Sequence, residues 1–228
     1  MLQCTLMNLP PVWLASASPR RQSMLGWMNL EFKIQAAEID ESLGPGELPM
    51  EYVSRLAREK AAAASKKIRA NGLILAADTA VVLNRDILGK PLNKGEAEKM
   101  LKALRNQSHQ VITALILLET QQAVSTIETC TSIVHMRNYN AEEISAYVES
   151  GDALDKAGAY AIQHPQFNPV DNLIGCYASV MGLPLCHLER NLRKFSDYQP
   201  VPINAVCQKF LDYTCPIHQR ILDGENIT

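Results

Sequence analysis

The sequence has 228 residues, of which 47% are hydrophobic and 20% are charged, and its formal net charge is −2. These values are typical of an ordinary globular protein and exclude a disordered or fibrous chain. The near-neutral balance also argues against a general nucleic-acid binder, which would carry a strong basic excess.

Strand-like and helix-like segments alternate through the N-terminal half, which indicates an α/β fold. Ser18-Pro19 places a capping residue before a proline at the first helical position, so a helix is expected to begin there. A long helix is expected over Pro49–Ala70, and the nearly continuous apolar run Leu73–Leu83 predicts a central strand. Shorter strands are expected at Pro11–Ala15 and Glu31–Gln35.

The C-terminal half continues this alternation. Asn84–Asp86 predicts a hairpin turn, and Asn93 with Glu96 forms a capping-box pattern at the start of a helix. Further strands are expected over Val111–Leu118, Ala123–Met136 and Ala178–Met181. Further helices are expected over Asn140–Glu149, from Pro184, and as a short docking helix around Val206, Phe210 and Leu211.

Several features favour a cytoplasmic protein that is not inserted in a membrane. No apolar run reaches the length of a membrane span. Met1–Pro10 lacks the basic and apolar regions of a secretory signal. Six cysteines are spread along the chain without a CxxC pair, so reduced and mostly buried thiols are expected. Their spacings match no known zinc-ligand pattern, so free thiols are favoured over a zinc site. The side chains that such a site would use are Cys176, Cys186, His187, Cys207, Cys215 and His218.

Two arginines, Arg20 and Arg21, stand in the first turn of the first predicted helix, where the helix dipole favours anions instead. The conflict disappears if a phosphate binds there, because free backbone N–H groups and two guanidinium groups would converge on one polyanion. The alternative is that both arginines point into solvent. The turn Ser16–Arg21 is therefore a candidate phosphate site.

Two further charged residues stand where the pattern predicts burial. On a helical wheel Lys60 lies near the middle of the apolar face of the long helix, and Asp78 lies inside the apolar strand. An unpaired buried charge is costly, so each is expected to be paired or to reach a ligand or metal. The alternatives are a lysine that snorkels to solvent and a core aspartate satisfied by backbone donors.

Loop lysines and a group of carboxylates complete this pattern. Lys90 and Lys156 each stand beside a glycine or proline in a turn, and with Lys60 and the two arginines they supply the cations that a triphosphate needs. Carboxylates supply the hard oxygen ligands that Mg²⁺ or Mn²⁺ prefers. The candidates are Glu38, Asp40, Glu41 and Asp78. The residues thus predict a phosphate-and-metal site without fixing a reaction.

A collinear series of motifs carries a family resemblance. The motifs are Leu14–Arg21, Ile39–Glu41, Leu56–Ala61, Ala77–Thr79, Leu88–Pro91, Leu154–Gln163 and Val180–Leu185. The series extends from about residue 12 to about residue 195 and resembles the Maf family of nucleotide pyrophosphatases. The resemblance implies a two-lobed, mixed-sheet α/β fold of the inosine-triphosphatase-like kind and a homodimer. Residues 1–199 would form this domain and residues 200–228 a C-terminal extension.

The same resemblance implies hydrolysis of a nucleoside triphosphate to the monophosphate and pyrophosphate, with a divalent cation (Mg²⁺ or Mn²⁺) as cofactor. Asp78 would be the general base or the activator of a metal-bound water, and Glu41 would help to hold the metal. The phosphates would be bound by Ser16, Arg20, Lys60 and Lys90. Phosphoryl chemistry needs positioning and charge neutralisation more than a covalent nucleophile, which agrees with these residue types.

Substrate selectivity depends on fewer residues. Arg21, Thr79 and Gln163 match the branch of the family that is selective for dTTP and UTP. A glutamine suits a uracil or thymine edge because its amide both donates and accepts hydrogen bonds. The chain departs from the family at His164–Pro169, where a glycine-rich stretch is common, and this departure bears on substrate preference.

Two classes of function remain open. The first is a house-cleaning hydrolase that removes non-canonical or excess pyrimidine nucleotides. The second is a nucleotide-binding regulator of cell division that binds without turnover, because the family is associated with septum formation. Asp78, Glu41 and Lys60 together favour the enzyme, since a pure binder need not keep a water activator beside a metal site. A transferase would need an acceptor pocket, of which the sequence gives no sign.

Overall fold

The computed structural model describes residues 9–120, 125–195 and 197–225. The expectations placed on residues 1–8, which include Cys4 and the secretory-signal segment, lie outside the described residues. The same holds for residues 121–124, and with them the start of the strand expected from Ala123.

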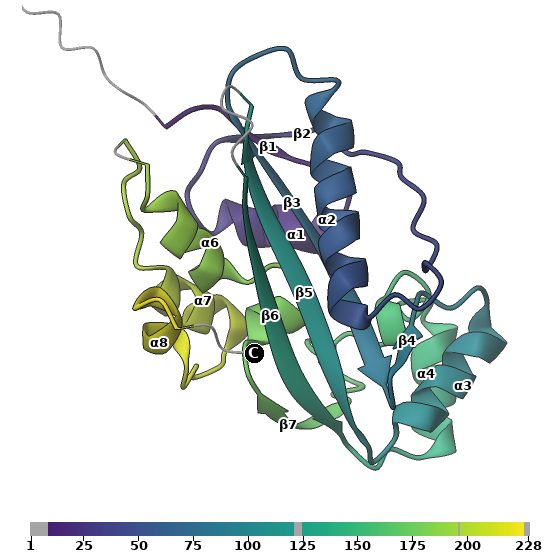
Figure 1. Ribbon diagram of the computed structural model, residues 1–228. Coiled ribbons are helices and arrows are strands. Elements are labelled where there is room, and N and C mark those ends of the chain that lie inside the picture. Colours follow the sequence, from purple (N-terminus) through teal and green to yellow (C-terminus); the bar gives the residue numbers. More distant parts are fainter. Residues whose placement is uncertain (1–8, 121–124, 196, 226–228) are drawn as a thin grey trace, which may run out of the picture.

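A mixed sheet forms the centre of the molecule, with strands in the order β2-β1-β3-β5-β6-β7 and β4 paired to β3 (Figure 1). The strands are β1 (Val12–Leu14), β2 (Phe32–Ile34), β3 (Leu73–Leu83), β4 (Asp86–Leu88), β5 (Ser108–Glu119), β6 (Ser125–Met136) and β7 (Val170–Ile174). β1 pairs in parallel with β2 and β3, whereas the other pairings are antiparallel. The predicted fold class, a mixed α/β sheet flanked by helices, is confirmed.

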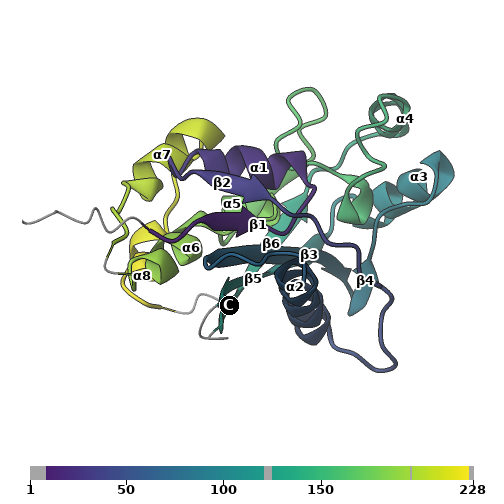
Figure 2. The ribbon, with the colours of Figure 1, turned by 90° about the horizontal axis from the view of Figure 1, so that it is seen from above.

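Helices cover both faces of this sheet. They are α1 (Pro19–Gly26), α2 (Pro49–Ser65), α3 (Lys94–Leu104), α4 (Ala141–Glu149), α5 (Tyr177–Val180), α6 (Leu185–Leu192), α7 (Ile203–Leu211) and α8 (His218–Leu222), with a 3₁₀ turn at Ala157–Ala159. Seen from above, α2 lies against one face, and α1, α6, α7 and α8 lie on the opposite side of the sheet (Figure 2).

The alternation of side chains along β3 divides the core into three clusters. Ile74, Ala76, Ala80 and Val82 pack with the apolar face of α2. The residues between them point to the other face, where Leu73, Leu75 and Ala77 join the cluster of α1, α6 and α7. Val81 joins a third cluster with α3 and α4. Because side chains alternate along a strand, Asp78 points to the α2 face and Thr79 to the α1 face.

Most local signals in the sequence act as predicted. The Ser18 hydroxyl accepts the Arg21 N–H at 3.5 Å, and Pro19 is the first residue of α1. Asn84 and Arg85 both have positive φ, as a two-residue hairpin turn of type I′ requires. Asn93 caps α3, but Glu96 accepts the N–H of Leu92 instead of the N–H of Asn93, so the capping box is incomplete.

Two expectations were wrong, and one strand was missed. Ala178–Met181 was expected as a strand, but Tyr177–Val180 forms the short helix α5, in which the Cys176 thiol caps the Ser179 N–H. The long helix ends at Ser65 and not at Ala70, since its C-terminal turn closes at Lys66 and Lys67. Strand β7 was not predicted, because it follows the proline-containing segment and has no continuous apolar run.

The C-terminal residues pack on the rest of the molecule. α7 contains Val206, Phe210 and Leu211, and the ring of Phe210 stacks on Trp27, the residue that caps the C-terminus of α1, with centroids 4.8 Å apart. Ile203 of α7 and Ile221 of α8 are buried in the cluster that also holds Leu14 and Met24. Within the part of the chain that is described, none of these helices combines the length and apolar character that crossing a membrane requires.

Candidate active site

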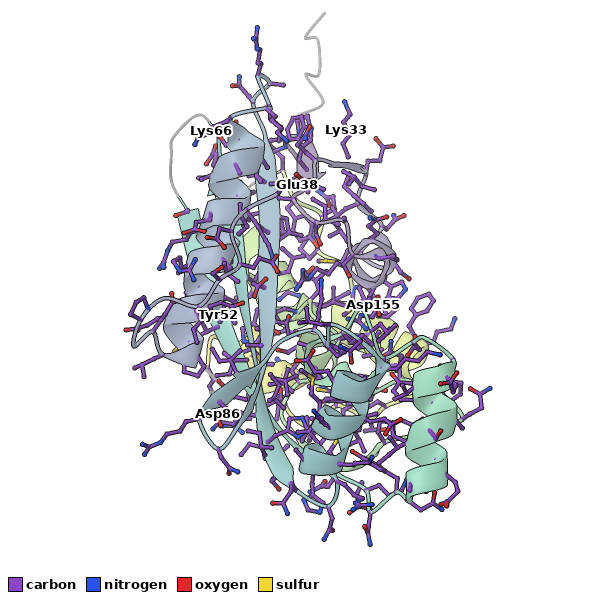
Figure 3. All side chains as sticks on the ribbon, turned by 90° about the vertical axis from the view of Figure 1, so that its right-hand side faces the viewer. Lys33, Glu38, Tyr52, Lys66, Asp86 and Asp155 are labelled. Carbon is purple, nitrogen blue, oxygen red and sulfur yellow. The ribbon has the colours of Figure 1, made fainter. Side chains whose placement is uncertain are left out.

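A gap along one edge of β3 opens the sheet to a cleft. β1 pairs with Leu73–Leu75 and β4 with Val81–Leu83, so among the described strands residues 76–80 of β3 are paired on the β5 side alone. Asp78 and Thr79 stand in this gap. The cleft measures about 910 Å³, within the range of about 300–1,000 Å³ usual for ligand sites. Figure 3 views the side that bears Glu38, Tyr52 and Asp155, which line the cleft.

The nine residues selected from the sequence meet in this one cleft. They are Ser16, Arg20, Arg21, Glu41, Lys60, Asp78, Thr79, Lys90 and Gln163. They come from the β1–α1 turn, the segment after β2, helix α2, strand β3, the turn after β4 and the segment after the 3₁₀ turn. Glu38 and Asp40 line the cleft as well.

Lys60 joins two carboxylates at the floor of the cleft. Its Nζ lies 2.5 Å from Asp78 Oδ1 and 2.7 Å from Glu41 Oε1. The side chains of Lys60 and Asp78 are both 11% exposed, so the anomalous burial of these charges is explained by their pairing. Burial alone would raise the pKa of Glu41, but the hydrogen bond and charge of Lys60 outweigh this effect and lower it.

The loop that carries Glu41 is fixed by helix α2. The Tyr52 hydroxyl donates to the Glu41 carbonyl at 2.9 Å. Arg55 makes a two-pronged ion pair with Glu47, at 2.6 and 2.8 Å, and also donates to the Ser42 carbonyl at 2.9 Å. The hydrogen bonds from Arg55 and from the Gly44 N–H lower the pKa of Glu47 to about 2. Neither Tyr52 nor Arg55 was predicted from the sequence, although both lie one or two helical turns before Lys60.

The β1–α1 turn presents polar groups to the cleft. Ser16 is buried, and its hydroxyl accepts the N–H of Ser18 at 3.2 Å. The Arg20 Nε is buried and has no hydrogen-bond partner among the described residues. A buried donor without a partner is costly, so this nitrogen marks a place where an acceptor is missing. A phosphate oxygen has the charge and the acceptor capacity that it needs.

Arg21 links three elements of the site wall. Its guanidinium donates to the Gly182 carbonyl at 2.8 Å, to Thr79 Oγ1 at 3.2 Å and to Ser16 Oγ at 3.4 Å. Gly182 has φ of +105°, and a Cβ there would lie 3.3 Å from the Arg21 Nε, so glycine suits this close approach. Burial lowers the pKa of Arg21, while the charge of Asp78 opposes the shift.

Two lysines that the sequence groups together differ in the structure. Lys90 is exposed at the rim of the cleft and is free to reach a ligand. Lys156 is only 6% exposed. Its Nζ donates to Asp155 Oδ1 at 2.6 Å, and to the carbonyl and Oδ1 of Asp152 at 2.6 and 2.9 Å. Lys156 also lines the cleft, but its ammonium is already paired with two carboxylates, and its role as a phosphate-binding cation stays a prediction.

The carboxylates of the cleft suit a hard divalent cation whose remaining ligands come from the phosphates of a substrate. Within residues 9–120, 125–195 and 197–225, no group of three or more His, Cys, Asp or Glu side chains could enclose a metal ion. Mg²⁺ is commonly bound by one or two carboxylates together with substrate phosphates. Glu41 and Asp78, brought together by Lys60, could supply that smaller ligand set.

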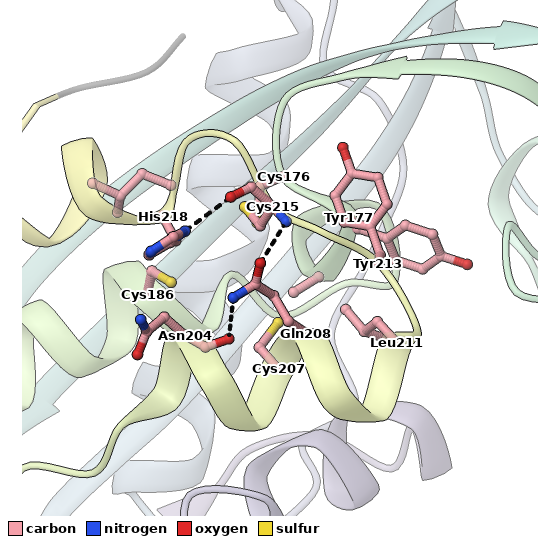
Figure 4. Close-up of a pocket in the computed structure, with 12 residues that line it drawn as sticks. Cys176, Tyr177, Cys186, Asn204, Cys207, Gln208, Leu211, Tyr213, Cys215 and His218 are labelled. Atoms are coloured by element: carbon pink, nitrogen blue, oxygen red, sulfur yellow. Dashed lines mark hydrogen bonds between the residues drawn. The ribbon is translucent and has the colours of Figure 1, made fainter.

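The cysteines form a separate apolar cluster. Cys176, Cys186, Cys207, Cys215 and His218 line a cavity of about 10 Å³ beside α7, too small for a nucleotide (Figure 4). The described cysteines are free thiols. Burial raises the pKa of Cys186 and of Cys207 to about 12. These thiols are therefore protonated and unreactive, as buried cysteines without a metal are.

Comparison with known proteins agrees with the motifs. Residues 11–195 match the model of the Maf-like protein family. A dTTP/UTP pyrophosphatase of Syntrophomonas wolfei is 45% identical over 172 residues, which cover 75% of this chain and 90% of that protein. A dTTP/UTP pyrophosphatase of Dehalococcoides mccartyi is 41% identical over 225 residues, or 94% and 100% of the two chains. A solved HAM1 protein of Coxiella burnetii has 19% identity and a TM-score of 0.45 over 70% of this chain and 90% of that one. The family resemblance inferred from the sequence is confirmed.

Proposed function

The chain belongs to the family of Maf-like proteins, and on that premise we propose that it hydrolyses nucleoside triphosphates, foremost dTTP and UTP, to the monophosphate and pyrophosphate. The observation that carries the proposal is the pair Asp78 and Glu41, held together by Lys60 opposite the Ser16–Arg21 turn. A water activator and a phosphate-binding turn thus face one cleft of nucleotide size.

Different residues of the cleft would activate the water, bind the phosphates and stabilise the charge that develops on them. Asp78 accepts the proton of the water whose oxygen attacks the α-phosphorus, and the bond from this phosphorus to the bridging oxygen breaks, which releases pyrophosphate. Arg20, through its unpartnered Nε, binds a phosphate oxygen together with Lys90 and the N–H groups of the turn. Lys60 orients both carboxylates and stabilises charge that develops on the phosphates.

A divalent cation completes this site. Glu41 and Asp78 would hold it together with the phosphates of the substrate. When bound, such an ion polarises the α-phosphate and lowers the pKa of the attacking water. The preference of hard cations for carboxylate oxygens makes Mg²⁺ or Mn²⁺ the expected cofactor.

Incubation with a panel of nucleoside triphosphates and Mg²⁺ or Mn²⁺, followed by product identification, tests the reaction. We expect monophosphate and pyrophosphate, with dTTP and UTP consumed fastest. Release of orthophosphate and a diphosphate would refute cleavage at the α-phosphate. Binding without any turnover would instead support the regulator of septum formation, an alternative that neither the cleft nor the comparisons favour.

Base selectivity is assigned to Gln163 at the rim of the cleft, with Arg21 and Thr79 shaping the wall beside it. Replacing Gln163 with alanine is expected to lower the ratio of kcat/KM for UTP over GTP by about tenfold or more, because an amide that pairs with the uracil edge is lost. Gln166→Ala is the matched control, since this exposed glutamine of the same segment lies away from the cleft. Unchanged selectivity in Gln163→Ala would remove this assignment.

We also propose where the enzyme acts, its oligomeric state and which part of the chain carries the activity. The enzyme would act in the cytoplasm as a homodimer that removes non-canonical or excess pyrimidine nucleotides. Residues 1–199 would carry the activity. Residues 200–228 would act as an extension whose helix α7 packs on α1, the helix of the phosphate turn.

A further inference from the structure

Tyr147 of α4 packs against residues 158–167, the segment that carries Gln163. Its ring stacks on Phe167, with centroids 4.4 Å apart and planes 9° from parallel, and meets the edge of His164 at 4.8 Å. Its hydroxyl accepts the Ala161 N–H at 3.0 Å and donates to Asp152 Oδ2 at 2.8 Å. The buried side chain of Tyr147 thus contacts the segment before Gln163, at Ala161, and after it, at His164 and Phe167. It also contacts Asp152, which precedes the segment.

Asp152 extends this contact into a network. While its Oδ2 accepts the hydroxyl of Tyr147, its Oδ1 accepts the Lys156 ammonium at 2.9 Å. Lys156 in turn bonds Asp155 at 2.6 Å. The buried ammonium thus holds the carboxylate that accepts the hydroxyl of Tyr147.

Further hydrogen bonds anchor the two ends of the segment. Gly158 donates its N–H to the Gly89 carbonyl at 3.1 Å, and its φ of +67° lets it approach Val81, from which a Cβ would lie only 2.9 Å away. At the other end, Arg137 donates to the Phe167 carbonyl at 2.9 Å. Between these anchors, the Ala161 N–H donates its hydrogen bond to the Tyr147 hydroxyl.

We propose that Tyr147 is a positioning residue for base selectivity: its hydroxyl fixes the Ala161–Gln163 turn so that the Gln163 amide is held at the edge of the base. The inference rests on the proposed function, because Gln163 is assigned to the base there. Tyr147 does not line the cleft, so it acts through the backbone of this turn.

Tyr147→Phe tests the proposal because it keeps the ring stack and removes only the hydroxyl. The ratio of kcat/KM for UTP over GTP is expected to fall about tenfold, while kcat for saturating UTP stays within about threefold, since the turn contributes to base recognition and not to the chemical step. The Ala161 amide should also exchange its hydrogen faster. Tyr139→Phe is the matched control, since Tyr139 is equally buried, contacts Phe167, and donates to the Leu101 carbonyl at 2.7 Å away from the cleft.

A double-mutant cycle separates this inference from the proposed function. In a Gln163→Ala background, Tyr147→Phe should change selectivity no further, because the amide that it positions is gone. Additive losses, or an equal loss of selectivity in Tyr139→Phe, would overturn the positioning role. Unchanged exchange of the Ala161 amide would overturn it as well, whatever the activity. The proposed function itself depends on the products of the wild-type protein, which are identified before any variant is compared.

Discussion

Replacing Asp78 with asparagine is expected to lower kcat by about 10²–10⁴-fold, the usual contribution of a positioned general base. The amide keeps the size of the side chain but cannot accept the proton of the attacking water. Nucleotide binding should survive, because Arg20, Lys90 and the turn at Ser16 are unchanged. Rapid-quench turnover with UTP, together with calorimetric binding of a non-hydrolysable analogue, measures the two effects separately.

The matched control for this experiment is Asp86→Asn. Asp86 is exposed at the start of β4 and lies outside the cleft. Its replacement therefore removes one carboxylate from the same part of the chain without changing the site. We expect wild-type turnover for this variant. A near-normal kcat in Asp78→Asn would mean that another group accepts the proton and that the assignment of the base is incorrect.

Replacing Lys60 with methionine should affect both stability and catalysis. Asp78 and Glu41 would then face each other without the cation that now lies between them at 2.5 and 2.7 Å. The free energy of unfolding at neutral pH should fall by about 1.5–3 kcal/mol, the value of hydrogen bonds to charged groups. kcat should fall by about 10²–10³-fold, as it does when one charge-stabilising donor is removed from an active site.

The stability loss in Lys60→Met should depend on pH. Because the folded pKa of Glu41 lies below its ordinary value, its pairing stabilises the protein above the ordinary pKa of glutamate. This contribution disappears as the pH falls through the lowered value. Urea unfolding from pH 7 to pH 3 should therefore show the difference between wild type and variant shrinking on acidification. Lys66→Met, an exposed position at the end of α2, should show no such trend; a constant difference for Lys60→Met would argue against the ion pair.

The sequence predicts those site residues whose charge stands in a segment that is otherwise apolar. Lys60 on an apolar helix face and Asp78 in an apolar strand are costly unless paired, and the structure pairs them with each other. The strand Leu73–Leu83 is predicted with its observed bounds because an apolar run of that length, limited by glycine and asparagine, has few other interpretations.

Other parts depend on tertiary contacts that leave no local pattern. A short apolar segment such as Ala178–Met181 has too few residues for a period of 2 to be told from one of 3.6. It becomes helical because the Cys176 thiol and the carbonyls of Cys176 and Tyr177 accept its N–H groups. Similarly, the sequence places Asp152 four residues before Lys156 but does not show that the turn between them brings the two side chains together.

The unbroken pairing of β3 with β5, from Leu73 to Val82, limits how the enzyme can move. Both walls of the cleft are attached to this one strand, the Ser16–Arg21 turn at its N-terminal half and the turn after β4 at its C-terminal half. A hinge between the walls would have to bend the ladder and break several backbone hydrogen bonds at once. The width of the cleft is therefore fixed by the sheet. Adjustment to nucleotides of different size is left to the side chains that line the cleft.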